Sequence, residues 1–389
     1  MILVTVFVPL IDVLTEVGFA SAYPQLLAWY GTSLRASSIV AVGPLATVTT
    51  GWMWGRIVRR RGLTNAMWLA VFGWSGAVLV MAAGLDLYAV MIAARALQGG
   101  FAAGFAAIPF IGVTALEQSH SAGSSRSLRS RRMSRIEVAA SIGAISGPIT
   151  VGSGMVLAPR GTLVTIALIP VVVILVLWRG KGAPTADGTP TADSPRSNAH
   201  PQPSKRRRIH RLLLPVLYAA MVGLVLSAFE LLVPTIVEER TTRPLVGKLA
   251  AMAFEVAVVA GVMIKARRTG VYWWLPVLVA ALTALGFVVA PGLSVLMAIL
   301  LAVGFGIGAQ VSMGNELAAQ SMRGFETAGM GAYATLRITG SFAGPLFLTI
   351  SYPFVLLALA VVSLLALYPV VRANRLNGVI GIPAGGVRN

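Results

Sequence analysis

Apolar runs of about 20 residues recur along the whole chain, and an α-helix needs about this length to cross the hydrocarbon core of a bilayer. The period-two alternation that a transmembrane strand needs is absent from these runs. Hydrophobic residues make up 57% of the chain and charged residues only 11%, whereas soluble domains carry about 25% charged residues. The sequence therefore predicts an all-α integral membrane protein.

The order of the apolar runs predicts two bundles of equal size. Twelve spans are expected, at 2–28, 37–58, 64–84, 87–112, 136–158, 162–178, 212–236, 245–265, 271–291, 294–318, 326–348 and 353–371. The segment between the sixth and seventh spans is rich in Pro, Ser, Thr and charge, which is typical of a disordered linker. We therefore predict a six-helix bundle at 1–178, a cytoplasmic linker at 179–211, a second six-helix bundle at 212–372 and a cytoplasmic tail at 373–389.

Basic residues concentrate in the loops on one side of the predicted membrane. The chain has 31 Lys and Arg against 13 Asp and Glu, and the arginine-rich segments 56–61, 126–135 and 179–211 all belong to loops of one parity. By the positive-inside rule this side is cytoplasmic. We expect a multi-pass protein of the cell membrane with both termini in the cytoplasm, and basic loops that contact anionic lipid rather than nucleic acid.

The two halves share sequence patterns. A G-x-x-x-G-P pattern occurs in the fifth and eleventh spans, at Gly143, Gly147 and Pro148 and again at Gly340, Gly344 and Pro345. The segments VRRRG and ARRTG likewise close the second span of each half. Parallel repeats of this kind place substrate sites at the midplane, between the halves. The glycines and proline predict a tight, kinked helix contact, and the same surface is a candidate for the rocking of the halves and a seal against proton leak.

Ionisable residues occur inside the predicted spans. At 1.5 Å per residue, Asp12 lies about 15 Å along the first span and Arg95 about 12 Å from the outer end of the fourth, so these two side chains are predicted to pair. Glu255 in the eighth span and Arg337 in the eleventh lie at a similar depth and are the second predicted pair. Glu16 follows Asp12 by one turn on the same helix face.

Charged groups at this depth are costly in lipid and usually mark a pathway. A carboxylate beside an arginine remains ionised until a proton or a cationic substrate competes for it. We therefore predict Asp12 and Glu16 as proton or cation sites that Arg95 tunes, with Glu230 at the rim of the cavity. The alternative is that the pairs are static salt bridges that set the helix register.

Arg95, Gln98 and Gly99, followed by small residues, resemble the fourth-span R-x-x-Q-G motif of the major facilitator superfamily, and the resemblance extends over essentially the whole chain. The fifth-span glycines and proline, together with Gly152, resemble the motif of its proton-coupled drug and metabolite antiporters.

The loop between the second and third spans is similar to the G-x-x-x-D-R-x-G motif of the same superfamily. Gly55 and Gly62 fit its glycines and Arg60 fits its arginine, but Arg59 stands where the motif has an aspartate. These four positions are the candidate gate on the cytoplasmic side.

The resemblance implies a secondary active transporter that works by alternating access, with proton-coupled efflux of a small organic or amphipathic compound, such as a drug-like molecule, a siderophore or a metabolite. A proton-coupled symporter for metabolite uptake is the alternative. No phosphate-binding P-loop motif occurs, so an ion gradient is expected to drive transport. We expect no enzyme activity, catalytic residue, metal or cofactor. The expected partners are a small-molecule substrate, protons and membrane lipids, with the protein acting as a monomer.

Overall fold

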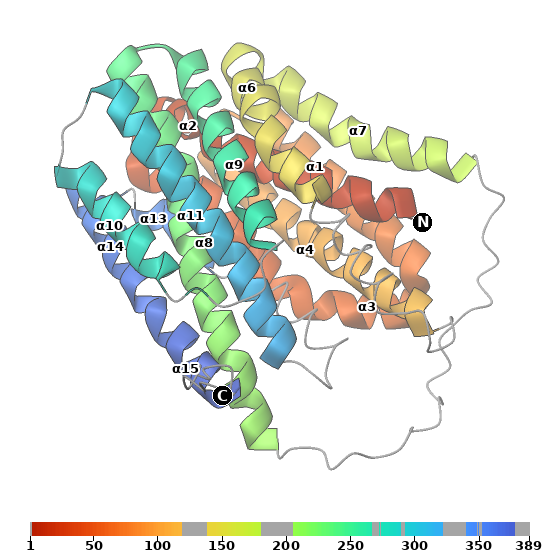
Figure 1. The fold of residues 1–389 in the computed structure, drawn as a ribbon. Helices are drawn as coiled ribbons and strands as arrows, with labels where there is room; N and C mark the ends of the chain where they lie inside the picture. The colour runs from red at the N-terminus through yellow and green to blue at the C-terminus, as the bar shows by residue number, and fades with distance from the viewer. Residues whose placement is uncertain are drawn as a thin grey trace.

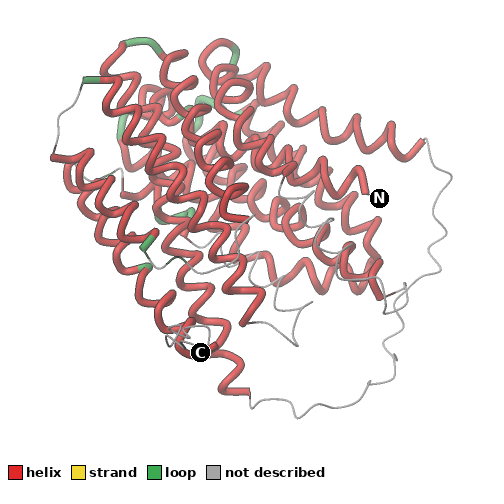
Figure 2. The backbone as a smooth tube through the Cα atoms, in the orientation of Figure 1, coloured by secondary structure: helices red, strands yellow, loops and turns green. Residues whose placement is uncertain are grey.

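The computed structural model describes residues 2–118, 138–179, 205–266, 272, 274–288, 292–321, 340–347, 349 and 352–377. All regular structure in these ranges is helical (Figures 1 and 2). Eight helices in the described part of the chain are long and apolar enough to cross a membrane. The predicted class, an all-α integral membrane protein, is confirmed.

The first half contains α1 (Ile2–Ser21), α2 (Tyr23–Tyr30), α3 (Ser33–Ala83), α4 (Tyr88–Gln118), the π-helical turn η1 (Pro148–Gly152), α6 (Ser153–Leu157) and α7 (Pro159–Arg179). With 51 residues, α3 is about 77 Å long at 1.5 Å per residue, more than twice the thickness of the hydrocarbon core. It contains the second and third predicted spans. They are separated at Gly62, whose φ of 77° and ψ of 162° are adopted almost only by glycine.

The second half contains α8 (Lys205–Thr241), α9 (Pro244–Ala266), α10 (Leu275–Val288), α11 (Leu293–Ser321), α13 (Gly344–Phe347), α14 (Tyr352–Leu365) and α15 (Leu367–Asn377). Helices continue into both ends of the predicted linker and into the predicted tail, so these ends are helical. Helix α7 includes Arg179, α8 begins at Lys205, and α15 runs to Asn377. Of the eleventh predicted span, the structure describes only 340–347.

The first predicted span is two helices rather than one. Helix α1 ends at Ser21 and α2 begins at Tyr23, with Pro24 in the first turn of α2. Proline has no backbone N–H to continue the helical ladder. The N–H of Gln25 donates to the carbonyl oxygen of Ala22 (3.0 Å), so the carbonyl oxygen of Ser21 is left for another donor.

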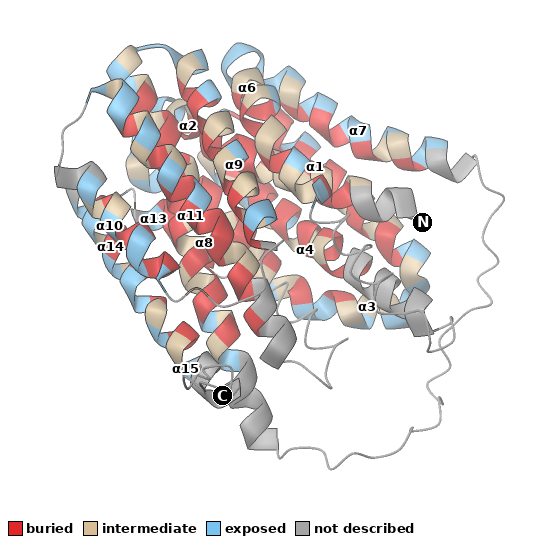
Figure 3. Cartoon of the chain, in the orientation of Figure 1, coloured by how far each residue is buried: buried red, intermediate tan, exposed pale blue. Residues whose placement is uncertain are grey.

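The buried side chains form two hydrophobic cores, the first in the N-terminal half with Leu231 of α8 added to it and the second in the C-terminal half. Figure 3 shows which parts of each helix are buried. In the first core the rings of Trp74 and Phe105 lie 5.6 Å apart, and in the second core Phe229 and Phe254 lie 6.0 Å apart. Many large apolar side chains on the outward helix faces are exposed, including Phe354. Lipid is as apolar as these side chains, so a membrane protein has no need to bury them.

The G-x-x-x-G-P patterns make equivalent contacts in the two halves. A Cβ at Gly143 would lie 2.4 Å from the carbonyl oxygen of Leu10 in α1, and a Cβ at Gly340 would lie 1.7 Å from that of Ala220 in α8. In both halves the missing side chain lets two backbones touch. The tight helix contact predicted from the repeated pattern is present in both halves.

Candidate functional site

A cavity of about 350 Å³ lies between the two halves. The first half contributes residues of α1, α3, α4 and the segment 138–147, and the second half contributes residues of α8, α9 and α11. Most of its lining is valine, alanine and other apolar side chains. Four carboxylates also line it, and all four are candidate site residues from the sequence: Asp12, Glu16, Glu230 and Glu255.

Arg95 lies behind the wall of this cavity and is completely buried. Its Nη2 donates to Oε2 of Glu16 at 2.5 Å, and its Nη1 donates to Oε1 of Gln98. The guanidinium also lies 4.5 Å from the centre of the Phe19 ring, a cation–π distance. The ion pair predicted between Arg95 and Asp12 therefore forms with Glu16 instead, one turn further along α1.

Glycines make the room that Arg95 occupies. A Cβ at Gly99 would lie 2.1 Å from the carbonyl oxygen of Gly43, so α3 and α4 meet backbone to backbone, and a Cβ at Gly43 would lie 3.0 Å from Cζ of Arg95. Thr47 strengthens the contact by donating to the carbonyl oxygen of Gly99 (2.9 Å). In this chain the R-x-x-Q-G pattern thus positions one arginine and closes one helix interface.

In the described part of the chain, the other three carboxylates form no ion pair with a lysine or arginine, although the charge of Arg95 also acts on Asp12. Oδ1 of Asp12 and Oε1 of Glu255 are buried without a hydrogen-bond partner. Charge interactions connect Asp12 with Glu16, Glu16 with Glu230, and Glu230 with Glu255. Among the described residues, no lysine or arginine lines the cavity. The cavity therefore contains an acidic row that runs from one half to the other.

Some predicted site residues lie elsewhere. Arg337, the predicted partner of Glu255, lies outside the described residues. Arg59 and Arg60 are exposed, and neither forms an ion pair with another described residue. Gly55 faces open space, and Gly62 breaks α3. The structure does not bring these four gate positions into contact with the cavity.

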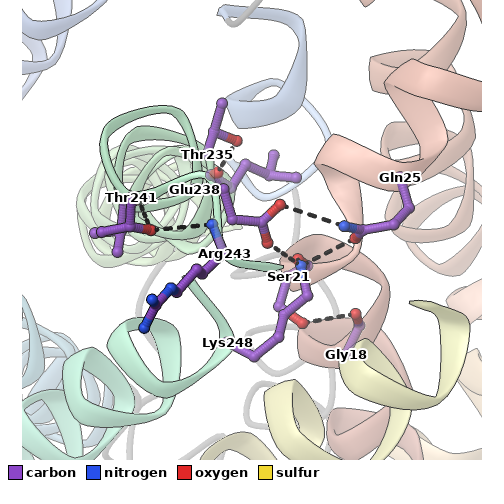
Figure 4. A network of polar contacts seen from close by, with 10 residues as sticks. Gly18, Ser21, Gln25, Thr235, Glu238, Thr241, Arg243 and Lys248 are labelled. Carbon is purple, nitrogen blue, oxygen red and sulfur yellow. Dashed lines mark hydrogen bonds and ion pairs between the residues drawn. The ribbon is translucent and has the colours of Figure 1, made fainter. Parts of the chain in front are cut away.

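A second polar cluster joins the two halves at a place separate from the acidic row. It consists of Lys248, Ser21, Gln25 and Glu238 and is called the Lys248 network below (Figure 4). Sequence reasoning did not single it out, although Lys248 falls inside the predicted span 245–265. Its signal in the sequence is a lysine inside the apolar helix α9, where a charge is costly without partners.

The described helices form two halves with a carboxylate-lined cavity between them, and transporters built from parallel repeats bind their substrates at this place. A model of the Major Facilitator Superfamily matches residues 4–345, and the chain belongs to this superfamily. The predicted family is thereby confirmed, as are a multi-pass membrane protein and a role in transmembrane transport.

A solved structure shares the fold. It is the crystal structure of a bacterial homologue of the human lysosomal transporter Spinster, in an inward-facing and occupied conformation. The superposition has a TM-score of 0.71 and 12% sequence identity, and it covers 96% of each chain. At this identity the likeness concerns the fold alone. A comparison with curated proteins found no match.

Proposed function

We propose that this protein is a proton-coupled exporter of small amphipathic cations that works by alternating access. The observation that carries the proposal is the acidic row in an apolar cavity between the halves, lined by no lysine or arginine among the described residues. The proposal places the protein in the cell membrane with both termini in the cytoplasm, following the distribution of basic loops.

The chemistry of exchange follows from the cost of an unpaired charge. An ionised carboxylate removed from water is costly unless a cation or a proton compensates it. Arg95 compensates the charge of Glu16, whereas Asp12 and Glu255 each have a buried carboxylate oxygen without a hydrogen-bond partner. When a cationic substrate enters, it takes the place of protons on these oxygens, and a proton that returns displaces the substrate.

The cavity also fits the size and polarity of such a substrate. A volume of about 350 Å³ is at the small end of the range of roughly 300–1,000 Å³ for ligand pockets. Apolar residues such as Val40, Phe105 and Val258 line it beside the carboxylates. The apolar body of a substrate would contact these walls, and its positive charge would meet the acidic row.

Proton release on binding tests the proposal directly. Purified protein in weakly buffered detergent is titrated with tetraphenylphosphonium, ethidium and benzalkonium, and with tetraphenylborate as an anion of the same shape as the first probe. We expect at least one cation to bind with release of protons and tetraphenylborate not to bind. Binding of tetraphenylborate as strong as that of the cations, or binding of no cation, would contradict the proposal.

Variants test whether the released protons come from carboxylates of the cavity. We expect Glu255→Gln to reduce the number of protons released per bound cation, because an amide carries no titrating proton. Glu239→Gln is the control, since Glu239 is an exposed carboxylate of α8 that does not line the cavity. In proteoliposomes, the direction of cation flux relative to an imposed pH gradient then separates export by exchange from uptake by symport.

A further inference from the structure

Lys248 lies near the start of α9, is fully buried, and binds oxygens of both halves (Figure 4). Its Nζ donates to the carbonyl oxygen of Ser21 (2.5 Å), to Oε1 of Gln25 (2.9 Å) and to Oε1 of Glu238 (2.5 Å). Gln25 also donates from Nε2 to Oε2 of Glu238 (3.3 Å). An ammonium has three donors, and here each has a partner.

The break between α1 and α2 prepares the first half for this contact. Because Gln25 donates its backbone N–H to Ala22, the carbonyl oxygen of Ser21 needs another donor, which Lys248 supplies. Gly152 of η1 lies against the same place, since a Cβ there would lie 2.2 Å from Oγ of Ser21 and 3.3 Å from Cδ of Lys248. The lysine is thus enclosed by backbone of the first half as well as hydrogen-bonded to it.

The network and the acidic row share the same helices. Lys248 precedes Glu255 on α9 by two turns, about 10 Å along the axis, and the two residues lie on nearly the same helix face. On α8, Glu230 lines the cavity and Glu238 belongs to the network. The network lies at the ends of these helices that the positive-inside rule assigns to the exterior.

We propose that the Lys248 network is the outer closure of the transporter. While Lys248 binds Ser21 and Gln25, the outer ends of the two halves stay together, and the cavity opens to the exterior only after these bonds break. The proposal rests on the alternating-access part of the proposed function, and it is independent of the substrate and of proton coupling.

The distribution of partners makes this closure reversible. The ion pair of Lys248 with Glu238 lies within the second half, so it can remain intact when the halves separate. Opening therefore exchanges the bonds of Lys248 to Ser21 and Gln25, and the bond of Gln25 to Glu238, for bonds to water. The ammonium keeps its counter-charge. A buried lysine that lost its carboxylate would be far more costly to move.

Cysteine labelling tests the closure without any substrate. The chain contains no cysteine, and Val40 lines the cavity about 10 Å from the start of α3. The Val40→Cys variant places one thiol there with a smaller side chain. A membrane-impermeant maleimide is applied to right-side-out and to inside-out vesicles, and the labelling rates are compared.

We expect Lys248→Met and Gln25→Ala, each in the Val40→Cys background, to raise labelling from the exterior by roughly tenfold, the change in an equilibrium that loss of one hydrogen bond to a charged group produces. Labelling from the cytoplasmic side is expected to fall, because molecules shift from the state that is closed on the outer side to the state that is open to the exterior. Asp86→Asn is the matched control, since Asp86 pairs with Arg160 inside the first half, where both side chains are largely exposed.

Unchanged exterior labelling in both variants would overturn the proposal. Faster labelling from both sides would also overturn it, because that result indicates loosened packing rather than an open outer face. Gln25→Ala keeps the buried ion pair, so it provides the test if Lys248→Met fails to fold. The proposed exchange of protons and cations can fail while the labelling result stands, and the reverse also holds.

Discussion

Arg95 donates to Glu16 at 2.5 Å, and this bond joins α4 to α1 at the wall of the cavity. One turn earlier on α1, Asp12 keeps a buried oxygen without a hydrogen-bond partner. The two neighbouring carboxylates are therefore in different situations. Glu16 is paired with a fixed cation, and we propose that Asp12 takes up the proton or the cationic ligand. We therefore expect opposite results from the two amide substitutions: Asp12→Asn should affect transport and not stability, and Glu16→Gln should lower stability.

Asp12→Asn is expected to remove proton-driven transport and to leave the fold unchanged. The substitution breaks no hydrogen bond of Oδ1, so the thermal midpoint should stay close to that of the wild type. Flux driven by a pH gradient in proteoliposomes should fall to the level of empty liposomes. A wild-type rate in this variant would refute the role of Asp12, and Glu239→Gln serves as the exposed control.

Glu16→Gln is expected to destabilise the protein. It removes the counter-charge of a completely buried guanidinium, and breaking a buried pair in this way costs about 3–5 kcal/mol. Thermal unfolding in detergent, followed by the fluorescence of the 8 tryptophans, measures the effect. Asp86→Asn breaks an exposed pair, which is worth about 0–1 kcal/mol. Equal shifts of the midpoint in the two variants would argue against a structural role for Glu16.

Gly99→Ala is expected to separate α3 from α4. The new Cβ would lie 2.1 Å from the carbonyl oxygen of Gly43, and overpacking of this kind costs about 1–3 kcal/mol. Gly76→Ala, also in a helix, meets nothing within 4 Å and should be neutral or slightly stabilising. The thermal midpoint and the yield of folded protein are measured for both variants. A Gly99→Ala variant as stable as the wild type would contradict the backbone contact between α3 and α4.

Gly62→Ala is expected to strain the break in α3. Gly62 and Gly55 both have open space around them, but only Gly62 has a positive φ, of 77°. Forcing a residue with a Cβ into this conformation costs about 1–3 kcal/mol, whereas Gly55→Ala places a methyl group in a regular helix. A lower thermal midpoint for Gly62→Ala than for Gly55→Ala is the expected result. The reverse order would show that the break does not depend on glycine.

The sequence by itself determined the class of fold and the depth of the charges. An apolar run of about 20 residues has one stable form in lipid, a helix that crosses it, and a fixed rise per residue then places Asp12, Arg95 and Glu255 well inside their helices. The repeated glycines of the two halves also predicted their backbone contacts, because close approach needs the absence of a Cβ wherever it occurs.

Only the tertiary structure decided which charges meet. Asp12 and Glu16 are one turn apart on the same face of α1, so depth alone could not choose between them, and the packing of Arg95 against Gly43 directs the guanidinium to Glu16. Lys248 and Ser21 are 227 residues apart in the chain. Their contact depends on how the two halves dock and on a carbonyl oxygen left over at a helix break, and neither is a property of local sequence.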